Sequence, residues 1–373
     1  MKRLLSLLKP SALIGLSGLA LLAASASLRA DDSSVGAVYT MTNAPAGNAV
    51  LVFDRARDGS LSPAGAFATG GKGTGTGLGN QGGLVLDRSH RLLLVVNAGS
   101  DELSAFAVTH SGVQLTDTEM TGGVRPISVT VHRNLVYVLN AGSDNLTGFR
   151  IDAFGDLQSI PGSSRALSGM ASDPAQVEFS PDGDVVVVTE KATSRILIYP
   201  VDDDGLLGAP TIHVSPTPTP FGFAFGKHDQ FFVSEAAGGA PGASAVSSYQ
   251  LHGGMASIVT VSAPTHQTAA CWVVVTSNGH FAYTSNTGSG TITGFAITPD
   301  GRLRELDADG ITGDTGAGSA PIDLALSRSN KFLYSLNSGN GSISAFRVGH
   351  SGELTALPTL FGLPAAANGL AAR

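Results

Sequence analysis

Leu92–Phe106 reads LLLVVNAGSDELSAF: an apolar run that stops at Asn97, a turn through AGSD, and a second strand with alternating character. The same unit recurs as LVYVLNAGSDNLTGF at 135–149, AYTSNTGSGTITGF at 282–295 and LYSLNSGNGSISAF at 333–346. Self-similarity of this kind indicates a repeat architecture, in which each copy buries its faces against its neighbours.

Seven copies become visible when the units are aligned on the residue that ends the second strand. The aligned residues are Asn43, Asn97, Asn140, Glu190, Glu235, Asn286 and Asn337, which follow one another at intervals of 43 to 54 residues. Each unit holds four short strand signals, separated by turn pairs such as Asp182-Gly183 and Asn278-Gly279. Seven such units predict an all-β fold, a seven-bladed β-propeller with four-stranded antiparallel blades.

The two ends of the chain predict how the ring closes. From Gly36 onward the first unit begins at its second strand and has no inner strand of its own. The C-terminal stretch Ala367–Ala372 resembles the inner strands of other units, such as Pro126–Val129. We therefore expect the C-terminal strand to join blade one, which leaves no free sheet edge in the ring.

Composition limits the possible partners and cofactors. With 48 Gly, 18 Pro and only 14% charged residues, the chain has the composition of an all-β protein. A net charge of −7 supplies no basic stripe for phosphates, so we expect a small-molecule ligand and no nucleic acid. The single cysteine, Cys271, cannot form an internal disulfide. We expect a monomer.

The N-terminus predicts a secretory signal peptide over residues 1–30. Lys2 and Arg3 precede an apolar run at 13–24, and small residues follow it, with cleavage expected after Ala26 or Ala30. The run is shorter than the roughly 20 residues that a membrane-spanning helix needs. We expect one propeller domain over residues 33–373, secreted or periplasmic and without stable membrane insertion; an uncleaved anchor is the alternative.

The blade signature resembles a known family. It reads PAQVEFSPDGDVVVVTEKATSRILIYPV at Pro174–Val201 and APIDLALSRSNKFLYSLNSGNGSISAFRV at Ala320–Val348. These segments look like the YVTN-type repeats of lactonase-type seven-bladed propellers, which include 6-phosphogluconolactonases and fungal carboxymuconate-lactonising enzymes. The resemblance implies lactone hydrolysis, or the reverse lactonisation of an unsaturated dicarboxylate.

One departure from the family pattern counts against sugar-phosphate lactone hydrolysis. Family members commonly carry Pro-His at the start of an inner strand. The corresponding pairs here are Pro126-Ile127, Pro174-Ala175, Pro220-Phe221 and Pro321-Ile322, none of which holds a histidine. A secretory leader also counts against a role in cytosolic sugar metabolism.

Propeller topology places the end of each second strand on the same face as the loops between blades. Asparagine at this position is explained by turn formation, since its side chain bonds the backbone two residues on. Glu190 and Glu235 make that bond poorly, and a carboxylate among apolar strand residues is costly unless paired or exposed. We therefore expect both glutamates to face one pocket as catalytic carboxylates, with a salt bridge or a solvated strand end as the alternative.

Histidine and arginine candidates follow from the same register. Seven of the nine histidines fall at turns on the opposite face, namely His90, His132, His228, His280, His110, His252 and His350, and His213 lies in an outer strand. His266 is then the candidate base on the expected site face. Arg125 can bind a substrate carboxylate or oxyanion through its guanidinium.

Candidate substrate-binding residues come from two sets. The starts of inner strands supply Gln81, Gln176, Trp272, Asp323 and Asn368, and the aligned column supplies Asn97, Asn140, Asn286 and Asn337. Turn formation by the asparagines and blade packing by Trp272 are the alternatives. Gly77–Gly82 fits G-x-G-x-x-G, but a strand follows it where a dinucleotide needs a helix N-terminus. We expect no cofactor and no metal.

Two function hypotheses result. In the first, a secreted lactonase-like hydrolase uses Glu190 or Glu235 to activate water, and Arg125 with Gln81 or Gln176 stabilises the oxyanion. In the second, a non-enzymatic propeller binds a glycan, a small ligand or a protein. Convergence of Glu190, Glu235, Arg125 and His266 on one pocket would favour the enzyme, and divergence would favour the binding module.

Overall fold

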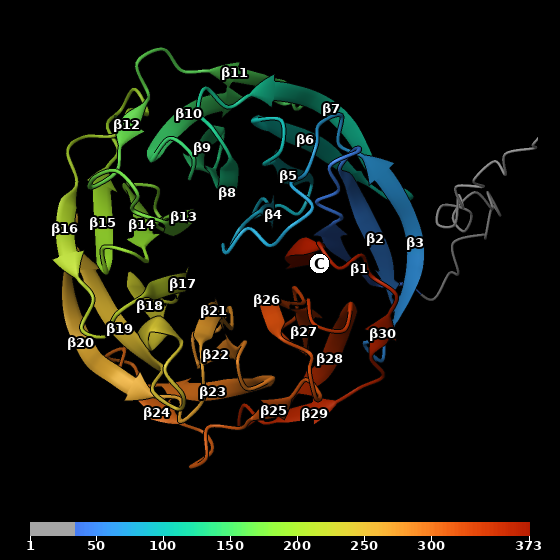
Figure 1. The fold of residues 1–373 in the computed structure, drawn as a ribbon, viewed down its shortest axis with the longest axis vertical. Coiled ribbons are helices and arrows are strands. Elements are labelled where there is room, and N and C mark those ends of the chain that lie inside the picture. Colours follow the sequence, from blue (N-terminus) through green and yellow to red (C-terminus); the bar gives the residue numbers. More distant parts are fainter. Residues whose placement is uncertain (1–33) are drawn as a thin grey trace, which may run out of the picture. The chain divides into compact units, whose positions relative to one another are not determined.

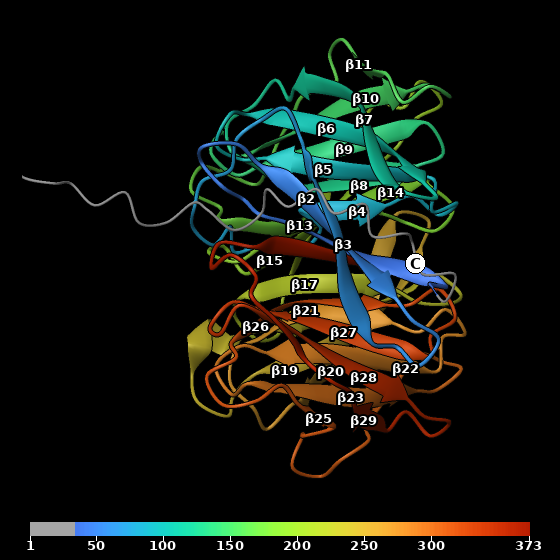
Figure 2. The same ribbon diagram turned by 90° about the vertical axis from the view of Figure 1, so that its right-hand side faces the viewer.

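The computed structural model describes residues 34–373, which form seven β-sheets arranged as blades around a central channel (Figure 1). The predicted signal peptide, residues 1–30, lies outside the described residues. In the described part of the chain, no helix has the length and apolar character needed to cross a membrane. The side view in Figure 2 shows the strands running across the thickness of the ring, so their ends lie on its two faces.

Each blade has four strands in sequence order from the channel outward, except blade 1. Blade 1 contains β31 (Asn368–Ala372), β1 (Gly36–Met41), β2 (Ala49–Arg55) and β3 (Leu61–Ala68). Blade 2 contains β4 (Leu84–Leu86), β5 (Leu92–Asn97), β6 (Glu102–Thr109) and β7 (Gly112–Met120), and blade 3 contains β8 (Pro126–His132), β9 (Leu135–Asn140), β10 (Asn145–Ile151) and β11 (Leu157–Ser159). Blade 4 contains β13 (Pro174–Phe179), β14 (Val185–Glu190), β15 (Arg195–Pro200) and β16 (Thr211–Val214).

The remaining blades follow the same plan. Blade 5 contains β17 (Pro220–Phe225), β18 (Gln230–Glu235), β19 (Ala245–His252) and β20 (Met255–Pro264), and blade 6 contains β21 (Ala270–Val275), β22 (Phe281–Asn286), β23 (Thr291–Ile297) and β24 (Leu303–Glu305). Blade 7 contains β26 (Pro321–Leu326), β27 (Phe332–Asn337), β28 (Ser342–Val348) and β29 (Leu354–Ala356). Short strands β12 (Arg165–Ala166), β25 (Gly313–Asp314) and β30 (Leu360–Phe361) extend the outer edges of blades 3, 6 and 7. One 3-10 helix, Ala237–Gly239, follows β18.

Burial decreases from the second strand outward, as the sequence pattern predicts. All six residues of β14 are buried because neighbouring blades cover both faces of the strand, whereas most of β16 is exposed. Tyrosines of the second strands tie adjacent blades together. The hydroxyls of Tyr137, Tyr283 and Tyr334 donate to the carbonyl oxygens of Gly205, Gly352 and Gly59, each in an outer turn of the next blade, at 2.7 to 2.9 Å.

The predicted ring closure is confirmed. Strand β31 pairs antiparallel with β1, with Ala372 opposite Val38 and Leu370 opposite Thr40. The Thr40 hydroxyl donates to the carbonyl oxygen of Asn368 at 3.2 Å, and Nη2 of Arg55 donates to that of Arg373 at 3.0 Å. The last residues of the chain are therefore the inner strand of the first blade.

Side chains on the inner strands also join each blade to the next. Gln176 of β13 accepts from the Phe223 backbone N–H at 2.7 Å and donates to the Phe223 carbonyl at 2.9 Å. Its side-chain amide thus joins β13 to β17 with the same pair of bonds that a backbone amide makes between paired strands. Ser128 of β8 accepts from the N–H of Val177 at 3.1 Å. Asp323 of β26 accepts from the N–H of Leu370 and so links blade 7 to the closing strand. Side-chain bonds of this kind thus link several of the inner strands around the channel to the next blade.

Deletion of residues 367–373 is expected to destabilise the whole propeller, because it removes the inner strand of blade 1 and exposes the edge of β1. We expect a loss above about 5 kcal/mol in unfolding free energy, since burial of Leu370 alone is worth about 2–5 kcal/mol. Thermal unfolding followed by circular dichroism measures it. A truncated protein with an unchanged melting temperature would refute this account of ring closure.

Candidate functional site

A cavity of about 520 Å³ lies in the central channel and is lined by the inner strands of all seven blades. It reaches the turns at the ends of these strands, where Arg88, His90 and His132 contribute to its wall. The wall is mixed: apolar side chains such as half-buried Val131 and Phe225 line it together with a similar share of polar groups. An apolar cavity with a few polar groups is the usual form of a small-molecule site.

The opposite end of the channel is closed by residues 77–83, which we call the plug segment. Figure 1 shows the chain before β4 running into the centre of the ring. Nζ of Lys191 in blade 4 donates to the Gly79 carbonyl at 2.6 Å, and Nε1 of Trp272 in blade 6 donates to the Asn80 carbonyl at 2.7 Å. The N–H of Gln81 donates to the Ala175 carbonyl at 3.0 Å. The plug segment is therefore bonded to blades on the far side of the channel.

Gln81 replaces a bridging side chain that blade 5 lacks. Gly222 of β17 occupies the position that Gln176 occupies in β13, two residues after the strand-opening proline, and a Cβ on it would lie 2.0 Å from Oε1 of Gln81. Gln81 accepts from the N–H of Val273 at 3.0 Å and donates to its carbonyl at 2.8 Å. The amide thus bridges blades 5 and 6 in the way that Gln176 bridges blades 4 and 5, at the plug end of the cavity.

Glu178 is the carboxyl group best placed for chemistry in this cavity. It lines the wall, is half-buried, and accepts one hydrogen bond, from Nε2 of Gln176 at 2.9 Å. Burial raises its pKa to about 8, although Arg88 and the Gln176 bond act in the opposite direction. Asp323 also lines the cavity, and burial raises its pKa well above the ordinary value, but it is tied to the backbone N–H groups of Leu324 and Leu370.

Two histidines line the cavity, contrary to the expectation that the turns after the inner strands lie away from the site. Burial lowers the pKa of His132, and Arg88 and Arg133 lower it further. Burial and Arg328 lower the pKa of His90 in the same way. Both imidazoles are therefore neutral at pH 7. The expectation was wrong for these two because the cavity reaches the ends of the inner strands, while the plug segment closes the other end.

Four of the five asparagines of the aligned column, all except Asn43, hold their own blades together. Each Nδ2 donates to a Ser or Thr hydroxyl seven residues later on the third strand: Asn97 to Ser104, Asn140 to Thr147, Asn286 to Thr293 and Asn337 to Ser344, at 2.7 to 3.0 Å. All four are fully buried, and none lines the cavity. These side chains are therefore structural, but they bond the third strand and not the backbone two residues on, so the predicted turn-forming bond is not the reason for asparagine here.

Glu190 and Glu235 occupy the same column position, but they accept hydrogen bonds where the asparagine Nδ2 groups donate them. Glu190 accepts from the N–H of Ser168 at 2.9 Å and from the hydroxyls of Ser168 and Thr193 at 2.5 Å. Glu235 accepts from the hydroxyls of Ser215, Ser247 and Ser262 at 2.8 to 2.9 Å. Both side chains are 0% exposed, neither lines the cavity, and they share no hydrogen-bond donor. The two carboxylates therefore do not face one pocket.

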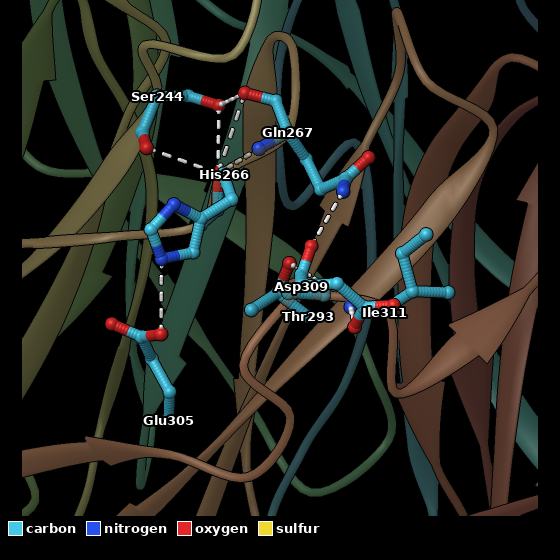
Figure 3. Close-up of polar contacts among 9 residues, drawn as sticks. Ser244, His266, Gln267, Thr293, Glu305, Asp309 and Ile311 are labelled. Carbon is cyan, nitrogen blue, oxygen red and sulfur yellow. Dashed lines mark hydrogen bonds and ion pairs between the residues drawn. The ribbon is translucent and has the colours of Figure 1, made fainter.

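His266 and Arg125 also lie apart from the cavity. Figure 3 shows the His266 ring pointing to Glu305, with Nε2 3.1 Å from Oε2 of that residue, and the His266 side chain is 46% exposed. The neighbouring Gln267 donates to the Asp309 carbonyl at 2.8 Å. Arg125 is exposed, and its backbone N–H donates to Oδ1 of Asp101. The four predicted catalytic residues thus do not converge.

Three of the predicted substrate-binding residues do meet in the cavity: Gln81, Gln176 and Asp323. Trp272 instead packs on Phe221, with ring centroids 4.9 Å apart, and Asn368 is buried beside Thr40. Glu178 was not predicted from the sequence, although it follows Gln176 by two residues on one strand, so that both side chains point to the same face. Among residues 34–373, no group of three or more His, Cys, Asp or Glu side chains is placed to hold a metal ion.

Comparison with known proteins gives a consistent picture of the fold. The family model described as "Lactonase, 7-bladed beta-propeller" matches residues 38–171 and 168–367. No curated protein matches the chain.

Three of the similar solved structures come from different bacteria. A protein from Lactobacillus plantarum is 19% identical with a TM-score of 0.73, and covers 91% of this chain and 99% of its own. A putative 6-phosphogluconolactonase from Bacteroides uniformis is 16% identical with a TM-score of 0.72, and covers 89% and 99%. A periplasmic gluconolactonase from Pseudomonas aeruginosa is 17% identical with a TM-score of 0.69, and covers 89% and 98%. At these identities the likeness concerns the fold.

Replacement of Glu235 by Gln is expected to lower the unfolding free energy by about 1–3 kcal/mol, because the new NH₂ group faces hydroxyl donors in a buried site. Urea denaturation measures the loss. Glu119→Gln, at an exposed carboxylate of β7, is the control and should change stability little. Full stability in Glu235→Gln would contradict the assignment of this carboxylate to blade structure.

Replacement of Gln81 by Ala is expected to loosen the plug segment, because it removes the bonds to Val273. Trp272 is the single tryptophan of the chain and bonds the plug segment directly, so its fluorescence reports on it. We expect red-shifted emission and stronger acrylamide quenching in Gln81→Ala than in the wild type. Gln250→Ala, on the outside of blade 5, is the matched control. Identical quenching of all three proteins would show that the plug segment does not depend on Gln81.

Proposed function

The chain belongs to the lactonase family of seven-bladed β-propellers, and we propose that it hydrolyses a small lactone inside the channel cavity. Support comes from the family match together with a carboxyl group of raised pKa in an apolar-walled cavity. A raised pKa near the operating pH suits a carboxyl group for proton transfer. In this proposal Glu178 takes the role that the sequence analysis gave to Glu190 or Glu235.

The proposed reaction opens the lactone with one water molecule. The Glu178 carboxylate removes a proton from the water, whose oxygen forms a bond to the lactone carbonyl carbon. The carbon–oxygen bond of the ring then breaks, and the proton held by Glu178 passes to the leaving ring oxygen. The product is an open-chain hydroxycarboxylate. The reverse sequence of steps on a hydroxy acid, with loss of one water molecule, would give lactonisation. On an unsaturated dicarboxylate the ring would form differently: a carboxylate oxygen bonds to one carbon of the C=C bond while protonated Glu178 gives its proton to the other carbon, and no water is lost.

Two neighbouring groups suit stabilisation of the oxyanion. The Thr130 hydroxyl accepts a hydrogen bond from the N–H of Phe179 at 3.0 Å, so its own proton is free for a ligand oxygen. His132 also lines the cavity, and its buried Nε2 has no protein partner in the described structure, so a rotation of the imidazole would bring this nitrogen to a ligand. Both side chains line the cavity alongside Glu178. Such donors act strongly in a site from which water is excluded.

The observation that carries the proposal is the contrast among the buried carboxyl groups. Glu190 and Glu235 are each held by three or more donors inside a blade, whereas Glu178 accepts one bond and faces open space. A carboxylate that is already saturated with donors has little capacity to remove a proton. Glu178 keeps that capacity.

We further propose that the protein acts on its small-molecule substrate as a monomer in a secreted or periplasmic location. The basic and apolar N-terminal segment supports this, and one similar structure is that of a periplasmic gluconolactonase. The second candidate function is ligand binding without turnover. It is favoured by the divergence of Glu190, Glu235, Arg125 and His266, and by the absence of Pro-His pairs at the strand starts.

Glu178→Gln is expected to lower kcat on a cleaved lactone by at least about 100-fold, the usual contribution of general base catalysis. In the wild type, kcat/KM should rise with pH and level off above pH 8, because turnover needs the deprotonated carboxylate. The pKa of His132 is lowered below 6.5, so it does not titrate in this range. A panel of lactones assayed by pH-stat titration provides the measurement.

Two controls make the assay decisive. Glu190→Gln, corrected for the fraction folded, should keep its turnover, and an equal loss in both variants would contradict the assignment of the base. Because the folded-state pKa of Glu178 is raised, wild-type stability should fall as pH rises toward 8, and the fall should be smaller in Glu178→Gln, which keeps the contributions of Asp323 and Glu235. Saturable lactone binding with no turnover would favour the binding module.

A further inference from the structure

The face on which the cavity reaches the surface carries an unusual ring of positive charge. We call the turns between inner and second strands the inner rim: residues 87–91, 133–134, 180–184, 226–229, 276–280 and 327–331. It contains six Arg or Lys residues, Arg88, Arg91, Arg133, Lys227, Arg328 and Lys331, against four Asp residues. All six cationic side chains are exposed. The inner rim is therefore basic in a chain whose net charge is −7.

The periphery of the same face has the opposite charge. The turns between third and fourth strands form an outer rim, which holds eight acidic residues, Asp58, Asp152, Asp156, Asp202, Asp203, Asp204, Asp300 and Glu353, against Arg57 and Arg302. All of these are exposed. A basic centre inside an acidic border directs small anions to the channel mouth. It also repels a flat anionic surface, which would meet the outer rim first.

The inner-rim cations have no carboxylate partners. Among residues 34–373 there are three ion pairs, and none includes an inner-rim residue. Asp87 and Asp182 cap their own turns, since Asp87 accepts from the N–H groups of Ser89 and Leu92, and Asp182 from that of Asp184. The cations are thus free to bind a ligand.

Arg88 lines the cavity, and Arg133 directly follows His132, another lining residue, in the turn after β8. Both arginines are exposed, so the two turns present guanidinium groups at the mouth of the cavity. Guanidinium groups bind carboxylates through paired hydrogen bonds. Below them, half-buried Val131, Phe225 and Leu326 face the channel.

We propose that the channel binds an amphipathic organic anion, with its apolar body between the inner strands and its carboxylate at the inner rim, held by Arg88 and Arg133. The apolar wall contributes affinity through buried ligand surface, and the rim sets the orientation. At pH 7 Glu178 is largely protonated, so the interior does not repel the ligand. A hydroxycarboxylate with an apolar tail, formed by opening of a substituted lactone, has this chemistry, but the binding does not depend on hydrolysis.

The test uses octanoate, octanol and acetate as probes, with calorimetry at pH 7 and Trp272 fluorescence as a second readout. We expect octanoate to bind the full chain more tightly than either octanol or acetate, because octanol lacks the charge and acetate lacks the apolar body. Octanoate binding should weaken several-fold between about 0.05 and 0.5 M salt, since exposed charges are screened over a Debye length of about 10 Å at 0.1 M.

A pair of charge-matched variants locates the site. Arg88→Gln/Arg133→Gln should weaken octanoate binding about tenfold and leave octanol binding unchanged, whereas Arg57→Gln/Arg302→Gln removes two charges from the outer rim of the same face and should not weaken octanoate. The inference is overturned if octanol or acetate binds as tightly as octanoate, if no probe binds, or if both variants behave alike. Each of these outcomes is independent of lactone turnover, which tests the proposed function.

Discussion

The structure depends on hydrogen bonds that run around the channel from the inner strand of one blade to the backbone of the next. Gln176 bridges blades 4 and 5, and Asp323 bridges blade 7 to the C-terminal strand. At blade 5 the bridging side chain is missing because the residue is Gly222, and Gln81 fills the place from across the ring. The same interaction that holds the inner strands together therefore closes one end of the channel.

The sequence was sufficient to predict the fold and the ring closure, because both follow from local patterns: strand alternation, turn pairs and a C-terminal segment that resembles the inner strands. The site was predicted only in part. Gln81, Gln176 and Asp323 line the cavity as expected, but Glu190 and Glu235 do not. Strand periodicity does not reveal which end of a channel is open. That depends on contacts such as Gln81 to Val273, between residues 192 positions apart.

The open end combines three features that suit a ligand with both apolar and charged parts. The wall contains apolar side chains beside polar ones, one lightly hydrogen-bonded carboxyl group faces the cavity, and a basic inner rim surrounds the mouth. A neutral lactone can enter such a cavity, and its opening creates a carboxylate whose charge the rim complements. Glu178 and the rim thus have separate roles, proton transfer inside and charge recognition outside.

The account places chemistry beside Glu178 rather than at the face closed by the plug segment. The most direct measurement is an experimental structure with a bound lactam. A lactam has an amide where the lactone has an ester, so it resists hydrolysis and stays intact in the site. The account predicts the lactam ring in the cavity, with its carbonyl group near Thr130 and His132 and a water molecule or ring atom in contact with Glu178. A lactam bound beside Lys191, Arg125 or Glu190, on the far side of the plug segment, would contradict it.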